Sequence, residues 1–185
     1  MPFDIYSESL YLANTIREIE YNYNKEIAKP NLISLASNEL FKIVTNLDKK
    51  FLKNIKLFIG PGNNGLDGLY LSSLLKKNKL NFSICLIGKS YSNHLNIIKE
   101  LSLEEYIAPS KDISCNNFTL IVDALFGTGL NRLLEREYIE VIEEFKNINK
   151  QNAYLLSLDV PTGLDSDKGT FFDTSKIFRA NLVCS

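Results

Sequence analysis

The sequence has few of the features that mark a secreted, zinc-binding or membrane protein. Its three cysteines, Cys85, Cys115 and Cys184, are odd in number and far apart, which is typical of neither a disulfide framework nor a zinc site. No apolar run approaches the roughly 18 residues that a membrane span requires. The stretch 1–14 lacks both the basic and the apolar region of a secretory signal. We therefore expect a cytoplasmic protein without a membrane partner, in which the two cysteines of strand-like runs are buried, inert thiols.

Charge of one sign and histidine are also scarce. With 21 Lys and Arg against 22 Asp and Glu, the formal net charge is −1, and no tract of five or more like charges occurs. Nothing in this balance recruits nucleic acid, so no nucleic-acid partner is expected. His94 is the only histidine. It lies away from the candidate loops in the sequence, so we expect a surface or helix-end position for it and propose no histidine-based catalysis.

Apolar periodicity predicts an α/β fold. The chain has 185 residues, 45% of them hydrophobic, which suits one globular domain. Short, wholly apolar runs alternate with helical patterns, the arrangement of βαβ units around a mostly parallel central sheet with helices on both faces. The sequence thus predicts a three-layer α/β domain with a helical N-terminus. The expected helices span 4–28, 31–47, 67–78, 92–104 and 135–148, and the expected strands span 55–60, 82–88, 118–127 and 153–163, with a fifth beginning in the final "FRANLVCS".

The loop after the first predicted strand reads "GPGNNGLDG" (60–68). Its glycines let the backbone approach a ligand closely at the start of a helix, which suits a phosphate. Asn63 and Asn64 add amide groups that could orient a polar ligand or coordinate a hard cation. The alternative is a Gly-Pro turn with Asn64 or Asp67 as the helix N-cap. The loop matches neither the dinucleotide fingerprint nor the P-loop.

Two further polar loops follow the third and fourth predicted strands. "DALFGTGLNR" (123–132) has a Gly-x-Gly turn, a hydroxyl and Arg132, which could bind phosphate or carboxylate or could simply be solvated. "DVPTGLD" (159–165) places Asp159 at a strand tip, where it could serve a ligand or form an Asx turn. Because the carboxyl ends of parallel strands share one edge of a sheet, we expect the three loops to form one binding site.

The blocks "GPGNNGLDGL", "VDALFGTGLNR" and "LDVPTGLDSDKG" resemble, in this order, the three signature blocks of the YjeF N-terminal domain, the NAD(P)HX epimerase family. The resemblance runs from about residue 55 to 185. It implies a Rossmann-like fold, usually dimeric, that interconverts the R and S epimers of hydrated NADH and NADPH. It also implies, as a partner in this cofactor repair, a separate ADP/ATP-dependent NAD(P)HX dehydratase.

The resemblance assigns site residues as well. It implies one K⁺ per subunit, bound by Asn64, Asp123 and Thr162, and carboxylate, amide and hydroxyl oxygens are suitable ligands for a hard cation. The implied substrate-binding residues are Asn63, Asn64, Gly65, Leu66, Asp67, Gly127, Thr128, Gly129, Leu130, Asn131, Arg132, Leu133 and Asp159.

The sequence departs from the family pattern in several places. Leu66 replaces a glycine, so either the backbone there is ordinary or the loop is altered. Thr162 replaces a serine and keeps the hydroxyl. Leu133 and Arg136 replace a proline and a glycine, and the segment 34–41 lacks the pattern typical of the family's second helix.

Asp159 is the expected general acid/base, because it ends a strand at the centre of the predicted site; Asp165 and Asp67 are alternatives, with helix capping as the ordinary role of each. A rival interpretation is a non-catalytic nucleotide-binding or scaffolding module of the same fold. A generic Rossmann-type enzyme acting on nucleotides or phosphosugars fits less well, because the loops lack its fingerprints. Residues 1–185 are expected to form a single domain of this family that lacks the family's last C-terminal segment.

Overall fold

A five-stranded parallel sheet forms the centre of the molecule. The computed structural model describes residues 12–26, 32–89, 92–109, 112–148 and 151–185. The strands lie in the order β2-β1-β3-β4-β7, and every neighbouring pair is parallel. Their bounds are β1 (Ile55–Ile59), β2 (Phe82–Leu86), β3 (Leu120–Ala124), β4 (Tyr154–Leu158) and β7 (Leu182–Cys184). The predicted parallel sheet, including its fifth strand, is confirmed.

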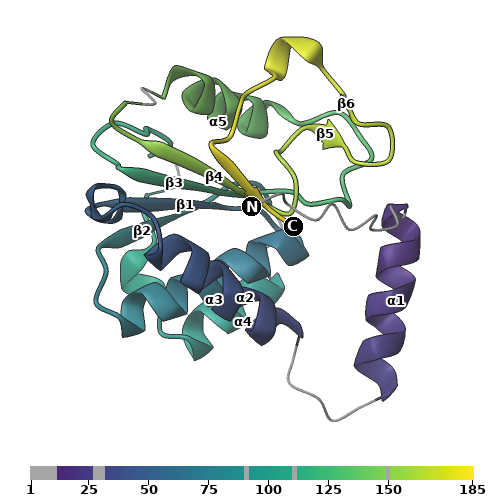
Figure 1. The fold of residues 1–185 in the computed structure, drawn as a ribbon, viewed down its shortest axis with the longest axis horizontal. Coiled ribbons are helices and arrows are strands. Elements are labelled where there is room, and N and C mark those ends of the chain that lie inside the picture. The colour runs from purple at the N-terminus through teal and green to yellow at the C-terminus, as the bar shows by residue number, and fades with distance from the viewer. Residues whose placement is uncertain (1–11, 27–31, 90–91, 110–111, 149–150) are drawn as a thin grey trace, which may run out of the picture.

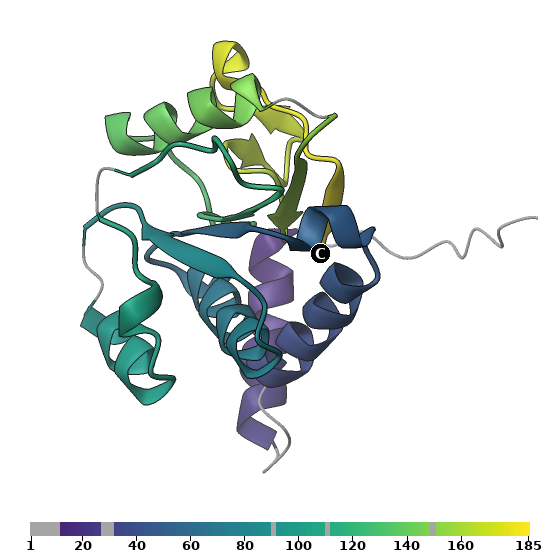
Figure 2. The same cartoon turned by 90° about the vertical axis from the view of Figure 1, so that its left-hand side faces the viewer.

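Helices cover both faces of this sheet (Figures 1 and 2). Three of them, α2 (Leu32–Thr45), α3 (Asn63–Lys77) and α4 (Ser92–Glu100), lie on one face, and α5 (Arg136–Asn147) lies on the other. The predicted three-layer α/β fold is therefore confirmed. Helix α1 (Ala13–Glu26) stands beside the layers (Figure 1). The segment 4–28 was predicted to form one or two helices; Leu12 lies just before α1 and is not helical, and residues 4–11 and 27–28 lie outside the described residues.

Several short elements were not predicted. A two-stranded antiparallel hairpin, β5 (Leu164–Asp165) with β6 (Thr170–Phe171), follows the third polar loop. Short 3-10 helices span Lys49–Leu52, Glu104–Tyr106 and Thr174–Lys176. None of the helices within the described parts of the chain is long and apolar enough to cross a membrane.

The order in which the chain adds strands to the sheet reverses between β1 and β3. From β1 it passes through α3 to β2 on one side, whereas β3 leads to β4 and β7 on the other. Open α/β sheets bind ligands at the carboxyl ends of the strands beside such a reversal. The loops are in close contact there: Gly60 N donates to Ala124 O at 3.0 Å, and a Cβ at Gly60 would collide with the Leu125 carbonyl.

Helix α3 begins four residues earlier than predicted. It starts at Asn63, and its N-cap is Gly62, which makes no side-chain capping hydrogen bond. The interpretation of Asn64 or Asp67 as the N-cap is therefore wrong. Leu66 lies within the first turns of α3 and is not among the described residues with positive φ, so its backbone is ordinary. Two of the glycines that suggested a loop, Gly65 and Gly68, instead lie inside the helix, where a Cβ would collide with Gly60 O or Ile59 Cδ1.

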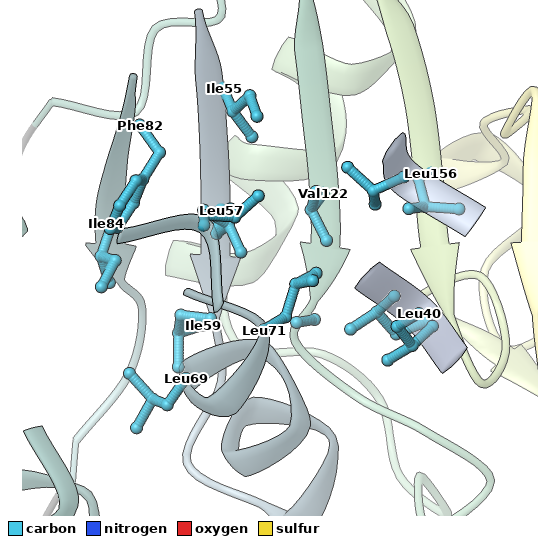
Figure 3. Close-up of a cluster of buried hydrophobic side chains, with 14 of the residues drawn as sticks. Leu40, Ile55, Leu57, Ile59, Leu69, Leu71, Phe82, Ile84, Val122 and Leu156 are labelled. Atoms are coloured by element: carbon cyan, nitrogen blue, oxygen red, sulfur yellow. The ribbon is translucent and has the colours of Figure 1, made fainter. Parts of the chain in front are cut away.

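Two apolar clusters join the layers. On the face covered by α2 to α4, Leu57, Ile59 and Val122 of the sheet pack with Leu71 of α3 and Leu40 of α2 (Figure 3). On the other face, the rings of Phe58 and Phe145 meet edge to face with centroids 5.1 Å apart. The mostly apolar strands are thus buried on both sides, as expected for a parallel sheet.

The contact between α3 and the sheet can be tested at Gly68. A Cβ there would lie 2.5 Å from Ile59 Cδ1 and 2.8 Å from Ala124 Cβ. Overpacking costs about 1–3 kcal/mol, whereas the gain in helix propensity from Gly to Ala is about 1 kcal/mol. We expect Gly68→Ala to lower the free energy of unfolding in urea by about 1–2 kcal/mol.

Gly62→Ala is the matched control, because a Cβ at Gly62 would meet no heavy atom within 4 Å. Its unfolding free energy should stay within about 0.5 kcal/mol of the wild type. Equal stability of Gly68→Ala and the wild type would contradict the close packing of α3.

Candidate functional site

A cavity of about 600 Å³ lies at the carboxyl ends of β1, β3 and β4. It is lined by residues from all three polar loops, as the sequence predicts. Eight of the predicted substrate-binding residues line it, namely Asn63, Asn64, Asp67, Gly127, Thr128, Gly129, Leu130 and Asp159. The topology therefore brings segments almost 100 residues apart in the chain, Asn64 and Asp159, to one site.

The other predicted binding residues lie outside this lining. Gly65 and Leu66 are in the first turns of α3. Asn131 lines a second, smaller cavity of about 260 Å³ beside the second loop. The side chain of Arg132 is 65% exposed and lies 3.6 Å from Glu135, and Leu133 is exposed at the surface.

Some lining residues were not predicted. Helix α2 contributes Ala36, Glu39, Leu40 and Ile43, and α1 contributes Ile16. Their helical spacing indicated a packed helix face, but not that this face closes a cavity. Only the position of α2 over the strand ends, which the sequence pattern does not encode, makes its residues part of the site.

Asp123 is a fully buried carboxylate at the end of β3. Its Oδ1 accepts from Thr162 Oγ1 at 2.7 Å and Leu125 N at 3.3 Å, and its Oδ2 accepts from Thr162 N at 3.0 Å and Ser157 Oγ at 3.1 Å. Burial raises the pKa of Asp123, and these hydrogen bonds oppose that shift. Among the described residues, no lysine or arginine forms an ion pair with it. A cation nearby would compensate this charge.

Asn64 presents an unsatisfied oxygen to the same region. The side chain is 6% exposed, and its Nδ2 donates to Leu158 O at 3.2 Å, whereas its Oδ1 has no hydrogen-bond partner. An unmade hydrogen bond of a buried oxygen costs about 1–3 kcal/mol, so this atom is suited to a ligand. Asn64 and Asp123 thus both reach the end of β4, where they bond to Leu158 and Ser157.

The donor set at this point favours a hard cation. It combines the Asn64 amide oxygen, the Asp123 carboxylate and the Thr162 hydroxyl, all oxygen atoms. Within the described parts of the chain, no three His, Cys, Asp or Glu side chains come together as a metal site. The residues that the family resemblance assigns to K⁺ therefore fit an alkali cation and do not form a transition-metal site.

Asp159 connects the third loop to the second. Its Oδ2 accepts from Thr128 N at 2.7 Å, and a Cβ at Gly127 would collide with that oxygen. The residue has φ +61°, in the left-handed region, which asparagine and aspartate tolerate better than most residues. The carboxylate thus bonds across the site to the second loop. Its direction depends on a glycine at 127.

The two alternative acidic residues have different surroundings. Asp165 accepts from Lys168 N at 3.1 Å and Asp167 N at 3.2 Å, and it pairs with Lys168 Nζ at 3.0 Å. These contacts, chiefly the one with the Lys168 side chain, lower the pKa of Asp165. Asp165 is therefore engaged in the β5–β6 turn and lines the smaller cavity, whereas Asp67 lines the larger one.

His94 lies beneath the first loop, so the expectation that it lies away from the loops is wrong. It is the third residue of α4 and only 3% exposed. Its Nε2 is 3.2 Å from Gly62 O. Burial lowers the pKa of His94, partly offset by backbone hydrogen bonds to Gly62 and Gly60. The folding of α4 against α3, invisible in the local sequence, brings it there.

The cysteines agree in part with expectation. Cys85 in β2 is fully buried, and burial raises the pKa of its thiol to about 11, so it is the inert thiol that was predicted. Cys184, in the other strand-like run, is only half-buried at the end of β7 and lines the larger cavity.

A family model and relatives of similar sequence all point to the same protein family. The model of the family described as YjeF-related protein N-terminus matches residues 29–185. The bifunctional NAD(P)H-hydrate repair enzyme Nnr of Dictyoglomus turgidum is 31% identical over 94% of this chain, which spans 35% of that relative. The NAD(P)H-hydrate epimerase of Lentilactobacillus buchneri is 31% identical over 86% of this chain and 75% of its own length.

Other relatives are also longer than the matched region. The NAD(P)H-hydrate epimerase of Leuconostoc sp. (strain C2) is 36% identical over 64% of this chain and 52% of its own length. The chain thus spans between about a third and three quarters of these relatives. Among solved structures, the crystal structure of yeast YNL200c matches with a TM-score of 0.75 and 20% identity, over 95% of this chain and 79% of that one, and supports the fold.

The bond between Asp159 and Thr128 N can be tested by amide hydrogen exchange. Removing the acceptor in Asp159→Ala should speed exchange of the Thr128 amide by about tenfold, because a hydrogen bond to a charged group contributes about 1.5 kcal/mol or more. NMR exchange rates measure this. Asp165→Ala, at a carboxylate that does not accept from Thr128, is the control. An unchanged Thr128 rate in Asp159→Ala would contradict the contact.

Proposed function

This chain belongs to the YjeF-related protein N-terminus family, and from that membership we propose that it is an NAD(P)H-hydrate epimerase. It would interconvert the R and S epimers of hydrated NADH and NADPH. The observation that supports this activity best is the meeting of Asn64, Thr128 and Asp159 in one cavity at the reversal of the sheet. The curated relatives that carry this activity in their names support it independently.

The cavity suits a dinucleotide. Its volume of about 600 Å³ lies within the range of small-molecule sites. Gly62 and Asn63, at the N-terminus of α3, line it beside the Gly127–Gly129 turn, so backbone N–H groups are available for phosphate oxygens. Ile16, Ile43 and Phe126, which are not fully buried, also line the cavity and provide an apolar surface against which a base or nicotinamide ring could pack.

The reaction requires inversion at the ring carbon that bears the added hydroxyl. In the simplest route, the C–O bond breaks with proton transfer to the departing oxygen, the ring nitrogen stabilises the resulting iminium-like cation, and water adds to the other face and returns a proton. Asp159 would donate the first proton and accept the second. Because its Oδ2 is held by Thr128 N, Oδ1 is the oxygen we assign to this exchange. The carboxylate would also stabilise the cation.

A potassium ion fits this proposal as a bound cofactor. Asn64 Oδ1, the Asp123 carboxylate and Thr162 Oγ1 would hold it, and it would supply positive charge that orders the loops and the diphosphate. The proposal includes one K⁺ per subunit. Its support is that the chain has a buried carboxylate, Asp123, without a lysine or arginine partner among the described residues, and a buried amide oxygen, Asn64 Oδ1, without a hydrogen-bond partner.

The proposed partners follow from the same activity. A separate ADP/ATP-dependent dehydratase would consume the S epimer in the cytoplasm.

We also propose a homodimer, supported by exposed apolar side chains on α1 and α2, Ile19 (54% exposed) and Leu35 (44%), whose burial against a second copy would be favourable.

Chiral chromatography of R-NADHX incubated with the protein in KCl tests the activity. Conversion to the R/S mixture should be much faster than the spontaneous rate, and Asp159→Ala should lose at least about 100-fold in kcat, as expected for a general acid/base. Asp165→Ala is the matched control and should retain activity. A folded wild type without conversion, stabilised by NADPH, would favour the binding-module interpretation.

Potassium dependence can be tested through thermal stability. At a K⁺ concentration about tenfold above its dissociation constant, the melting temperature should exceed that in NaCl of equal ionic strength by about 3–6 °C. Thr162→Val, which removes the hydroxyl, should abolish this difference, whereas Thr162→Ser should keep it. A response to Na⁺ equal to that to K⁺, or a full response in Thr162→Val, would contradict the site.

A further inference from the structure

Beneath the glycine-rich turn that joins β1 to α3, the ring of His94 occupies a position with a defined polar partner. The ring is 3% exposed, and its Nε2 lies 3.2 Å from the carbonyl oxygen of Gly62. A carbonyl oxygen only accepts, so Nε2 carries the proton and donates. The ring makes a further hydrogen bond to the Gly60 backbone. His94 therefore touches both glycines that flank Pro61.

This turn has no side-chain cap of its own. Gly62 is the N-cap of α3 and makes no side-chain capping hydrogen bond. Glycine also loses more conformational entropy than other residues when its backbone is fixed, so a glycine-rich turn is costly to order. Gly62 O also accepts from Leu66 N at 3.3 Å, the first bond of the helix. The contact with His94 thus falls on the carbonyl group at which α3 begins.

The first turn of α3 fits tightly around the ring. A Cβ at Gly65 would collide with Gly60 O and would lie 3.1 Å from His94 Nε2. The three glycines 60, 62 and 65 therefore surround one edge of the imidazole. On the other side of the same turn, Gly62, Asn63 and Asn64 line the cavity.

We infer that His94 is a positioning residue: by donating to Gly62 O from below, it fixes the turn that presents Asn63 and Asn64 to the ligand. The side chain of Asn64 is anchored by the hydrogen bond from its Nδ2 to Leu158 O, and its Oδ1 has no hydrogen-bond partner. The direction of that oxygen consequently depends on the backbone of the turn. The kinetic test of this inference rests on the proposed function, because it measures KM for R-NADHX. A second test measures the binding of K⁺ and NADPH and does not require catalysis.

Three substitutions separate positioning from packing. Glutamine places an amide N–H about where Nε2 lies, so His94→Gln keeps the donor, whereas His94→Leu and His94→Asn remove it from that position. We expect His94→Leu and His94→Asn to raise KM for R-NADHX about tenfold, the equivalent of one lost hydrogen bond of about 1.4 kcal/mol, with kcat changed less than about threefold. His94→Gln should return KM to within about threefold of the wild type.

The binding measurements use NADPH and KCl as probes. The K⁺ concentration for half-maximal rise in melting temperature, and the dissociation constant of NADPH, should both increase about tenfold in His94→Leu and recover in His94→Gln. Ile98→Val, a mild change at a buried residue of the same helix, is the control for lost packing. It should lower the melting temperature and leave both binding constants unchanged.

The outcomes are distinct. If the wild type does not epimerise R-NADHX, the proposed function fails, and the NADPH and K⁺ titrations still decide the role of His94. If the wild type is active and His94→Leu binds as the wild type does, the inference is overturned. Equal losses in His94→Leu and His94→Gln would also overturn it, because the ring would then act through its shape and not through its donor.

Discussion

The buried carboxylate of Asp123 is the interaction on which the site depends. It lies at the tip of β3, fully removed from solvent, and accepts four hydrogen bonds from Thr162, Ser157 and Leu125. These donors come from the second loop, β4 and the third loop, so one side chain of β3 contacts three other segments. A buried charge is stable only when its environment compensates it. The compensation here comes from the dipoles of these hydrogen-bond donors, because no lysine or arginine among the described residues forms an ion pair with Asp123.

The remaining contacts of the site follow from this centre. Thr162 is fixed by Asp123, and its loop begins at Asp159, whose carboxylate holds Thr128. The second loop is thus attached to the third, and the third to the sheet. The first loop joins through Asn64 and the end of β4. Each loop is thus positioned by a polar contact with another strand or loop.

The sequence predicted the three layers of the fold and the edge of the sheet at which the site lies. It could do so because strand periodicity and the order of helices and strands can be read along the chain. Apolar runs gave the sheet, and the rule for carboxyl ends of parallel strands gave the convergence of the loops. The start of α3 was predicted too late because Gly65 and Gly68 have low helix propensity. Glycine occurs at these two positions because a Cβ would collide with Gly60 from position 65, and with Ile59 and Ala124 from position 68.

Other features required tertiary information. The position of His94 beneath the first loop depends on how α4 packs on α3, and the contribution of Glu39 to the cavity depends on where α2 crosses the strand ends. Nothing in the spacing of the sequence encodes these distances. The exposed position of Arg132 beside Glu135 has the same origin, since a loop residue's direction is set by the packing around it.

The segment Thr128–Leu130 lines both the larger cavity and the smaller polar one, so it is a partition with a chamber on each side. One face meets Asp159 and Leu158, and the other meets Asp165 and Lys168. The partition is held at Thr128 from both sides: its N–H donates to Asp159 Oδ2, and its carbonyl accepts from Ser166 Oγ at 3.4 Å. A small molecule lodged in the polar chamber would press on the same residues that shape the larger one. The shapes of the two cavities are therefore not independent, because the same three residues set one wall of each.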